Sequence, residues 1–323
     1  MADVKLLIKN DRYIQEPVLL EGVTWETARK EEPSKLTFTV VKDNLLAFDE
    51  GAEVRLIVDG KDVFFGYVFE KSRNKEHHID VVAYDQLRYL QNKTSYRWYG
   101  VRADQVIQRI ASDFRLKTGS LANTGFIIPK FEELDVSLFD MVQSAIDDTV
   151  MNTGNLFYLY DDCGYLTLKN IKDSVIPILI DGETAEDFDY STSIDSETYN
   201  RIVIAEDSDQ QASGVYEVAM DERNAAKWGV LQYFESGYKG QNALNKAKTL
   251  LKLHNQVSRS LTVTGCLGDV RVRAGTSVYV DLNLGDEELI NQRMLVEKAS
   301  HTFNEGHHFM DISVVGCKEF YGE

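Results

Sequence analysis

The stretch that decides the fold is "SHTFNEGHHFMDISVVG", residues 300–316 of a chain of 323 residues. Apolar and polar residues alternate on both sides of Asn304-Glu305-Gly306, with the period of two that is typical of β-strands. A glycine at the end of a three-residue connection favours a hairpin in which Gly306 takes the left-handed backbone conformation. The stretch therefore predicts two long antiparallel strands.

The same stretch holds three of the six histidines of the chain, which raises the question of a metal site. In the predicted hairpin Thr302 faces His308, so His301 and His307 share one face of the sheet and His308 points to the other. A metal site needs at least three converging ligands. At most two histidines converge here, so we expect no metal and interpret all three as strand residues.

An earlier stretch resembles this hairpin. Both "VFEKSRNKEHHIDVV" (68–82) and "LVEKASHTFNEGHHFMDISVV" (295–315) contain a strand ending in Glu-Lys, a polar turn, His-His, and a strand with an Asp before Val-Val. The loops differ in length and the Asp is offset by one residue. A glycine and an alternating strand precede each of them, in "EGAEVRLIV" (50–58) and "RAGTSVYVDL" (273–282). This self-similarity predicts two diverged copies of one sheet motif, with the His-His pairs at equivalent strand starts.

The first 90 residues consist mainly of predicted strands. Stretches rich in β-branched and aromatic residues are separated by turn signals, and Asp59-Gly60 between apolar residues predicts a tight hairpin. So many strands leave edges that must be covered, which predicts a sheet that closes or folds on itself. The stretches are "KLTFTVV" (35–41), "EVRLIV" (53–58), "VFFGYVFEK" (63–71) and "HIDVVAY" (78–84).

The middle of the chain has a different pattern. In "ADQVIQRIASDF" (103–114) and "SLFDMVQSAIDDTV" (137–150) apolar residues recur at i, i+3, i+4 and i+7, which predicts two amphipathic helices. Ser137 and Asp140 resemble a capping box at the start of the second helix, with Asp in place of Glu. Gly154 is the expected stop signal for that helix.

Strands return toward the C-terminus. "NLFYLYDDCGYLTLKN" (155–170) predicts a hairpin, and alternating stretches from about residue 196 predict a second β region with one helix near 241–254. The predicted fold class is mainly β (α+β). The predicted segments are a first β domain at 1–90, an α+β middle domain at 91–170, a connecting segment at 171–195, and a second β domain with one helix at 196–323.

Composition and charge exclude several function classes. The chain is 43% hydrophobic and 27% charged, which is ordinary for a globular protein, but 52 acidic against 35 basic residues give a net charge of −17. A field of that sign opposes binding to nucleic acid or to an anionic membrane. The opening "MADVKLLIKNDRY" lacks the apolar stretch and cleavage site of a signal peptide, and no apolar run approaches the roughly 18 residues of a membrane helix, so we expect neither. Cys163, Cys266 and Cys317 form no CxxC pair, so we expect neither a disulfide framework nor a zinc site. We therefore expect the protein to fold in a cytoplasm.

Acidic pairs and one aromatic run are the remaining candidates for chemistry. A hydrolase uses two carboxylates on opposite sides of a bond, but in a chain so rich in acids we interpret the pairs as solvated surface. The run "TSYRWYG" (94–100) fits stacking on a sugar or base, or filling a seam between domains, and we favour the seam. The sequence contains no GxSxG, HExxH, P-loop or GxGxxG motif. The acidic pairs are Glu132-Glu133, Asp147-Asp148, Asp161-Asp162 and Asp286 to Glu288.

Stretches along nearly the whole chain are similar to the XkdQ/YqbQ-like proteins of defective prophages and phage-tail-like bacteriocins. The most specific is "AYDQLRYL" (83–90). The wider relatives of that family are late control D and other baseplate hub proteins of contractile tails, and the N-terminal half of VgrG-type spikes. The other stretches are "PSKLTFTVVKDNLLAFDEGAEVRLIVDGKDVFFGYVFEKSR" (33–73), "IIPKFEELDVSLFDMVQSAIDDT" (127–149), "YNRIVI" (199–204), "WGVLQYFE" (228–235) and "VEKASHTFNEGHHFMDI" (296–312).

The resemblance implies a non-enzymatic structural protein. It implies two tail-tube-like β-barrel domains per chain and a homotrimer that joins the hexameric tail tube to the trimeric spike, in contact with other baseplate proteins. It also implies assembly in the cytoplasm of a bacterial host and a final place in a virion or bacteriocin particle. The family has no catalytic motif, so we assign no catalytic, cofactor-binding or metal-binding residue and expect no cofactor.

Two points stay open from the sequence. The helix predicted from residue 103 is preceded by Val101-Arg102, where a Thr or Ser cap is expected. The second function class is a tail-associated cell-wall hydrolase or sugar-binding module, for which the acidic pairs and the Tyr96-Trp98-Tyr99 cluster are the best candidates.

Overall fold

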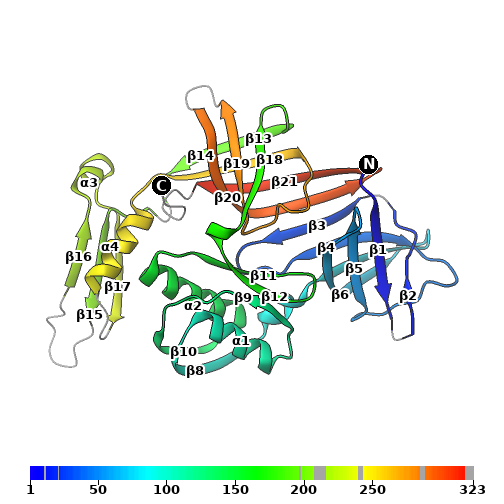
Figure 1. Cartoon of the computed structure of the whole chain (residues 1–323), viewed down its shortest axis with the longest axis horizontal. Helices are drawn as coiled ribbons and strands as arrows, with labels where there is room; N and C mark the ends of the chain where they lie inside the picture. Colours follow the sequence, from blue (N-terminus) through cyan, green and yellow to red (C-terminus); the bar gives the residue numbers. More distant parts are fainter. Residues whose placement is uncertain are drawn as a thin grey trace.

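The computed structural model shows a mainly β protein built from four parts (Figure 1). The first β unit (residues 1–85) is followed by a middle unit (86–173), and the second β unit (174–195 and 258–316) encloses an insert (198–254) in its sequence. The structure describes residues 1–10, 12–20, 22–195, 198–206, 216–238, 243–283 and 288–316. Within this part of the chain, no helix is long and apolar enough to cross a membrane.

The first β unit contains the four predicted strands, three of them with the predicted bounds. Asp59 and Gly60 have φ values of 50° and 74° and connect β5 (Glu53–Val58) to β6 (Lys61–Arg73) in the predicted two-residue hairpin. The other strands are β1 (Val4–Lys9), β2 (Ile14–Gln15), β3 (Val23–Ala28), β4 (Lys35–Val41) and β7 (His78–Tyr84).

The sheet of the first β unit folds back on itself, as predicted. The chain that follows β2 returns to the free end of β4, where Leu20 N–H donates to the Thr39 carbonyl at 2.8 Å and Val41 N–H donates to the Val18 carbonyl at 3.0 Å. The enclosed core consists of alternate residues of the strands, which explains the period of two in the sequence.

The middle unit contains both predicted helices, α1 (Ala103–Asp113) and α2 (Leu138–Thr153). The capping box of α2 is present, because Asp140 N–H donates to Ser137 Oγ and Ser137 N–H donates to Asp140 Oδ2. Gly154 ends α2 in the left-handed conformation with φ 69°. The other elements are η1 (Gln86–Gln91), β8 (Lys93–Val101), β9 (Thr118–Leu121), β10 (Ile128–Ser137), β11 (Phe157–Asp161), β12 (Leu166–Asn170) and η2 (Ile171–Asp173).

The predicted connecting segment contains two strands. β13 (Val175–Asp181) pairs in parallel with β19 (Ser277–Asn283), and β14 (Asp187–Ser193) pairs antiparallel with β18 (Ser258–Leu267). The segment predicted only as a connection therefore contributes two strands to the sheet. Among the described residues each of the two strands is paired along one side only, and β14 (DFDYSTS) lacks the continuous apolar pattern of a central strand.

The region predicted as one β domain with one helix begins with the insert, which has two helices and a sheet of its own. Its core packs α4 (Ala243–His254) on the central strand β15 (Arg201–Glu206). Residues 241 and 242, where the helix was predicted to begin, lie outside the described residues. The remaining elements are β16 (Tyr216–Met220), α3 (Glu222–Trp228) and β17 (Gln232–Tyr238). The division of the chain into domains stays a prediction.

One sheet runs through both β units, in the order β14-β18-β21-β20-β3-β4-β7-β6-β5-β1-β2. The units join where β20 (Glu288–Asn304) pairs with β3, and Figure 1 shows these strands side by side. β20 also pairs with β21 (His307–Gly316) and, through its first half, with β19. The order β3-β4-β7-β6-β5-β1 in one unit matches β14-β18-β21-β20-β19-β13 in the other, in the same chain order. Only the last pair differs, since β1 is antiparallel and β13 is parallel to its neighbour.

The match holds residue by residue and confirms the predicted repeat. Gly51 and Gly275 have φ values of 87° and 89°. Their N–H groups donate to the carbonyls of Val68 and Val296 at 2.7 and 2.8 Å. In both units a β-bulge follows this valine. A bulge, a glycine and a strand order that all recur are difficult to explain except by two copies of one motif.

The bulges also correct the predicted alignment of the two copies. Beyond them Ser72 pairs with Asp80, and Ser300 pairs with Asp311. Aligning these pairs removes the one-residue offset of the Asp, but it makes His308 of the second copy equivalent to His77 of the first. The two His-His pairs are therefore displaced by one residue, and the expectation that they occupy equivalent positions is wrong.

Candidate functional site

The histidine-rich hairpin has a shorter loop than predicted. β20 and β21 are connected by Glu305 and Gly306 alone, with φ values of 51° and 74°, and Asn304 pairs with His307. This register is shifted by one residue, and such a shift moves every side chain of a strand to the other face. The predicted faces are therefore wrong: His301 lies beside His308, and their Nδ1 and Nε2 atoms are 2.9 Å apart.

His301 is buried between the two β units and fully bonded. Its Nε2 lies 2.8 Å from the Val272 carbonyl, which only accepts, so Nε2 carries the proton. Nδ1 then accepts a hydrogen bond from His308 Nε2. The ring stacks on Trp25 with centroids 4.9 Å apart. Burial and the neighbouring His308 lower the pKa of His301 to about 3, so the ring is neutral at physiological pH.

Substitution of His301 by phenylalanine is expected to reduce the pH dependence of stability. Between pH 6.5 and pH 3 the unfolded chain binds a proton at this ring and the folded chain does not. The stabilisation is thus complete above pH 6.5 and falls with pH by up to about 1.4 kcal/mol per unit. Urea unfolding at pH 7, 6 and 5 measures the slope. The same substitution at the exposed His77 is the control. An equal slope in the wild type and in the His301 variant would contradict the assignment.

No metal centre is assigned to the histidines. In the described ranges, no three His, Cys, Asp or Glu side chains come together as a potential metal site. We predict that elemental analysis of the purified protein finds no stoichiometric zinc, nickel or iron. About one metal ion per chain, lost on substitution of His307, would refute this prediction.

The described cysteines are unreactive by environment. Cys163 is partly buried and Cys266 is buried, and neither is bonded to another cysteine. Burial, together with nearby carboxylates, raises the pKa of both thiols to about 11, so they stay protonated at neutral pH. Cys317 lies outside the described residues.

Where the structure describes them, the acidic pairs proposed from the sequence do not form a carboxylate pair across a cleft. Glu132 forms ion pairs with Arg97 and Lys130, and Glu133 accepts a hydrogen bond from Ser144 at 2.6 Å. Asp161 is buried while its neighbour Asp162 is exposed. Of the last predicted cluster, Asp286 and Glu287 lie outside the described residues.

Asp147 and Asp148 lie on α2, where α2 meets α4 of the insert. Asp147 accepts a hydrogen bond from Gln143 at 2.7 Å. Burial raises the pKa of Asp148 to about 6, against the opposing charge of Lys246. Lys246 is itself buried and forms an ion pair with Glu235 at 2.7 Å. The charges therefore belong to the contact between the middle unit and the insert.

Two further buried carboxyls, Asp85 and Asp161, were not predicted to act together. Asp85 is 1% exposed and accepts hydrogen bonds from the backbone N–H groups of Leu87 and Ser34. Burial and the charge of Asp161 raise the pKa of Asp85 well above its ordinary value. Asp161 accepts from Gln86 at 2.7 Å and from Gly164 N–H at 2.6 Å, and burial raises its pKa as well.

The residues around these carboxyls connect the middle unit to both β units. Gln86 binds Asp161 and also both backbone groups of Lys117, its amide donating to the carbonyl and its oxygen accepting from the N–H. Arg273 of the second β unit donates to the Asp161 carbonyl at 3.0 Å, and its guanidinium lies over the rings of Tyr160 and Trp25. The residues Asp85 and Gln86 belong to "AYDQLRYL", so the most specific stretch of the sequence has an architectural role.

The aromatic run lies inside the middle unit rather than in a seam between domains. Tyr96 and Trp98 stack at 4.4 Å, and Trp98 stacks on Phe131 at 5.7 Å. Tyr96 Oη donates to Asp113 Oδ2 at 2.6 Å. The third ring, Tyr99, is 66% exposed. The three rings therefore do not form one stacking platform.

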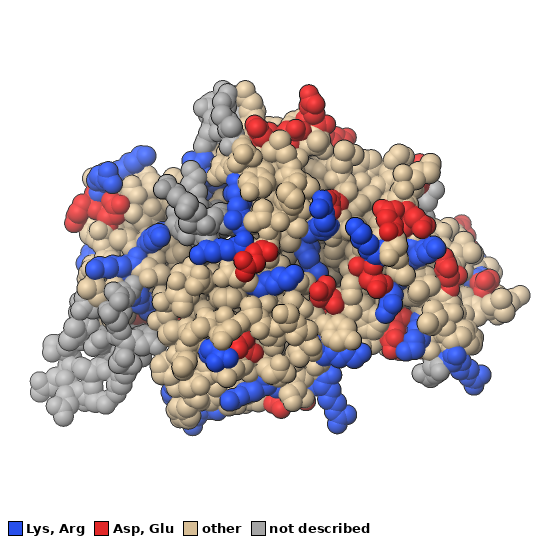
Figure 2. All heavy atoms as spheres, in the orientation of Figure 1, with Lys and Arg blue, Asp and Glu red and all other residues tan. Residues whose placement is uncertain are grey.

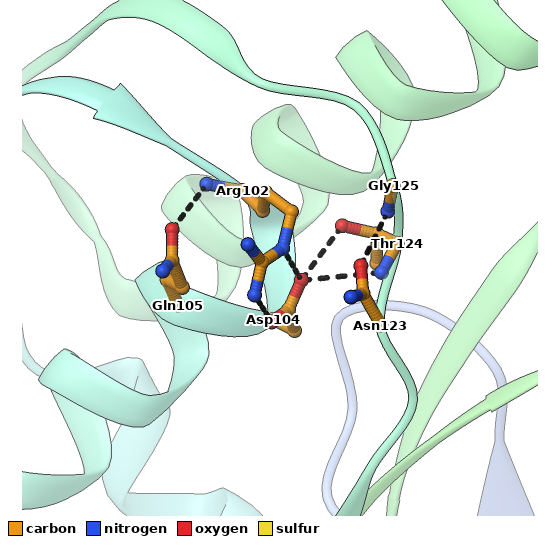
Figure 3. Close-up of polar contacts among 6 residues, drawn as sticks. All are labelled: Arg102, Asp104, Gln105, Asn123, Thr124 and Gly125. Atoms are coloured by element: carbon orange, nitrogen blue, oxygen red, sulfur yellow. Dashed lines mark hydrogen bonds and ion pairs between the residues drawn. The ribbon is translucent and has the colours of Figure 1, made fainter.

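The start of α1 shows how the expected Ser or Thr cap is replaced (Figure 3). Arg102 N–H donates to Gln105 Oε1 at 3.0 Å, and the Arg102 guanidinium forms a two-point ion pair with Asp104. Asp104 Oδ1 also accepts from the N–H and hydroxyl of Thr124, as Figure 3 shows. Burial alone would raise the pKa of Asp104, but these partners lower it. The network attaches the loop at Thr124 to the helix.

A polar face runs across both β units on the side of the sheet away from the two β-unit cores. Cross-strand neighbours such as Thr262–Ser313, Ser300–Glu26 and Thr39–Asp80 give it short hydroxyl and acidic side chains. It is hollowed where the units meet, with a volume of about 760 Å³. Over its central strands the acidic residues are Glu26, Glu70, Asp80, Asp187, Asp189 and Asp311 and the lysines are Lys35 and Lys298. Glu32 and Arg88 also line the hollow, and toward β5 and β1 the face carries Glu53 with Arg55, Lys5 and Lys9.

Charge is mixed on the face of the molecule that Figure 2 shows. On the face shown in Figure 2, Lys and Arg side chains are interspersed with Asp and Glu over the β units, without a broad basic field. Such a surface gives a duplex no continuous track of cations for its phosphates.

Comparison with known proteins identifies relatives of the whole chain. The phage-like element PBSX protein XkdQ of Bacillus subtilis (strain 168) is 32% identical over 319 residues, covering 96% of this chain and 95% of the relative. The 43 kDa tail protein of prophage MuSo2 from Shewanella oneidensis has a similar structure, with TM-score 0.70, 13% identity, and coverage of 97% and 98%. The E. coli c3393 protein, a component of the type VI secretion system, has TM-score 0.58 at 10% identity, with coverage of 98% and 78%.

These likenesses agree with the fold described above: the chain has the fold of phage tail proteins. The family model described as YQBQ-like matches residues 23–315, which include the first β unit from β3 onward, the middle unit, the insert and nearly all of the second β unit. With that match and the full-length relative, the chain belongs to the YQBQ-like family.

Proposed function

We propose that this protein is the baseplate hub of a contractile phage tail or phage-tail-like particle, a structural protein that adapts the hexameric tail tube to the trimeric spike. The observation that carries the proposal is the pair of equivalent β units joined in one sheet by β20 and β3. The solved relatives are named as phage tail and type VI secretion proteins, which supports a place in such a particle.

Symmetry explains why a hub would contain two copies of one unit. We propose that each unit is a tail-tube-like β-barrel and that the chain forms a homotrimer. Three chains then supply six similar units, so one face of the ring matches a sixfold tube while the other keeps threefold symmetry for the spike. The middle unit and the insert, present once per chain, need only threefold symmetry and belong toward the spike or outside the ring.

Light scattering tests the assembly. The chain mixed with its cognate spike protein is expected to give a complex of three chains with three spike subunits. A homotrimer of the chain alone can be weak, because a partner that binds the assembled form stabilises it by mass action. A mass that fits one or two chains per spike would refute the adaptor.

We propose that the polar face lines the lumen of the ring, and we predict that it does not bind DNA. A tube that passes DNA works best with a neutral or acidic wall, because bound phosphates would slow the passage. The purified chain is expected to show no duplex binding at physiological salt in a fluorescence anisotropy titration. A Glu26→Lys, Asp311→Lys variant is the positive control for charge, and tight binding by the wild type would contradict the prediction.

We propose no enzymatic activity and no cofactor. Among the carboxyls with raised pKa values, Asp85 and Asp161 are buried and Asp148 is half-buried where α2 meets α4, so all three support a structural role. Incubation with peptidoglycan distinguishes this from a wall hydrolase. Release of sugar or peptide, lost on substitution of an acidic residue, would favour the enzyme. The proposed location is the host cytoplasm during assembly and the tail baseplate afterwards.

A further inference from the structure

The junction between the two β units has an uncovered counterpart at the far side of the first unit. In the second unit, the part of β20 beyond the bulge, Lys298–Phe303, is covered by β3. The equivalent part of β6, Glu70–Arg73, pairs with β7 on one side. Among the described residues, no strand pairs with its other side, and Glu70, Ser72 and Arg73 are exposed. An uncovered strand edge is a template for pairing with another chain.

The strand equivalent to β3 has a free edge as well. β14 pairs with β18 as β3 pairs with β4, but β14 ends the sheet. Val23 and Trp25 of β3 are 3% and 2% exposed. At the equivalent positions of β14, Phe188 is 38% exposed and Tyr190 is only half-buried. The second unit therefore presents apolar side chains where the first has them covered.

We propose that β14 of one chain pairs with β6 of the next chain in the same way as β3 pairs with β20 within each chain. The intrachain register pairs Ser300 with Glu26 and Ala299 with Thr27. Transferred by the structural repeat, it pairs Ser72 of one chain with Ser191 of the next, and Lys71 with Thr192. This inference rests on the proposed hub function, which supplies the three chains that close the ring.

The aromatic stacking at the intrachain junction has an expected counterpart at the proposed interchain junction. His301 stacks on Trp25 at the intrachain junction. The repeat places Arg73 opposite Tyr190 at the interchain junction, and an Arg guanidinium also stacks on an aromatic face. A planar group thus covers an aromatic ring in both cases.

The residue at the bulge and the residue that faces it differ between the two junctions, but they match each other in both. At the intrachain junction, Arg29 forms an ion pair at 2.8 Å with Glu297, the extra residue of the bulge. The equivalent residues are Ile194 and Phe69, two apolar side chains. An ion pair in one junction is therefore replaced by an apolar pair in the other, and neither replacement leaves an unpaired charge.

β3 and β14 carry a threonine at the same position of the repeat. Thr27 Oγ1 accepts a hydrogen bond from Ala274 N–H at 3.0 Å, which attaches the loop before β19 to β3. The equivalent of Thr27 is Thr192, and the equivalent of Ala274 is Glu50, in the loop before β5. The same hydrogen bond is expected between Thr192 of one chain and Glu50 of the next.

Disulfide trapping tests the register. The variants Ser72→Cys and Ser191→Cys are purified separately, mixed at high concentration and oxidised with diamide. Their Cα atoms would be opposed in an antiparallel pair, within the distance that a disulfide spans. We expect a covalent dimer in the mixture and none above the wild-type background with either variant alone. Trapping accumulates even a minor associated population, so a stable trimer is not required.

A one-residue shift provides the matched control. Lys71→Cys mixed with Ser191→Cys places the thiols on opposite faces of the sheet, so it should not crosslink. Equal crosslinking by this control, or no dimer in the Ser72 and Ser191 mixture, would overturn the proposed pairing. A three-to-three complex with the spike that lacks the crosslink would refute the pairing and leave the hub. The crosslink without that complex would support the pairing and refute the adaptor.

Discussion

Replacement of Trp25 by alanine is expected to lower the free energy of unfolding by about 3–5 kcal/mol. Trp25 is 2% exposed and lies at the junction of the two β units. Its ring stacks on His301, and its Nε1–H donates to Ser34 Oγ at 2.9 Å. Alanine leaves a cavity at the junction, which the hydrogen-bonded strands β3 and β20 cannot move together to fill. It also removes the hydrogen-bond donor to the buried Ser34 hydroxyl. Urea denaturation monitored by circular dichroism measures the change.

Tyr190→Ala is the matched control for this prediction. Tyr190 occupies the equivalent position in the second β unit, but among the described strands none pairs with the other side of β14. In the isolated chain its truncation should therefore cost less than half as much as that of Trp25. Equal costs for the two variants would mean that Trp25 does not gain its stability from the cover that β20 provides.

The strands were predictable where one face is buried and the other is wet. β4, β5 and β7 have the predicted bounds, because in each of them buried core residues alternate strictly with less buried ones. β13 was missed for a physical reason as well. It contains Pro177, which cannot donate to a ladder, and the strand tolerates it because it pairs with β19 alone.

The histidine faces were mispredicted because the loop length depends on one backbone choice. The same sequence fits a three-residue loop in which only Gly306 is left-handed, and a two-residue loop in which both Glu305 and Gly306 are left-handed. A glutamate with positive φ is uncommon, so the sequence favours the wrong loop. The error of one residue moved His308 to the other face and hid its contact with His301.

The site that holds the units together could not be derived from spacing. Asp85 and Asp161 come from different units, and Arg273 reaches them from a third part of the chain. Each has ordinary sequence neighbours, and only burial distinguishes Asp161 from the exposed Asp162 beside it. The resemblance marked the stretch that contains Asp85 and Gln86, but tertiary contact alone explains why that stretch is specific.

The two equivalent glycines separate backbone strain from crowding. Gly51 and Gly275 have nearly the same positive φ, 87° and 89°. A Cβ atom at Gly51 would meet nothing within 4 Å, whereas one at Gly275 would lie 2.1 Å from Cδ2 of Tyr158. Tyr158 is buried in the middle unit and donates to Ser174 Oγ at 3.0 Å, so its ring has little room to move.

Gly51→Ala is therefore expected to cost about 1–2 kcal/mol of stability through the left-handed backbone alone. Gly275→Ala is expected to cost a further 1–3 kcal/mol, roughly, because the added methyl overpacks the contact between the second β unit and the middle unit. Urea unfolding of both variants gives the difference. A double-mutant cycle with Tyr158→Ala then isolates the clash, since removal of the ring should recover most of that extra cost. Equal destabilisation by the two glycine variants, or no coupling between Gly275 and Tyr158, would show that the second β unit does not bear on the middle unit at this contact.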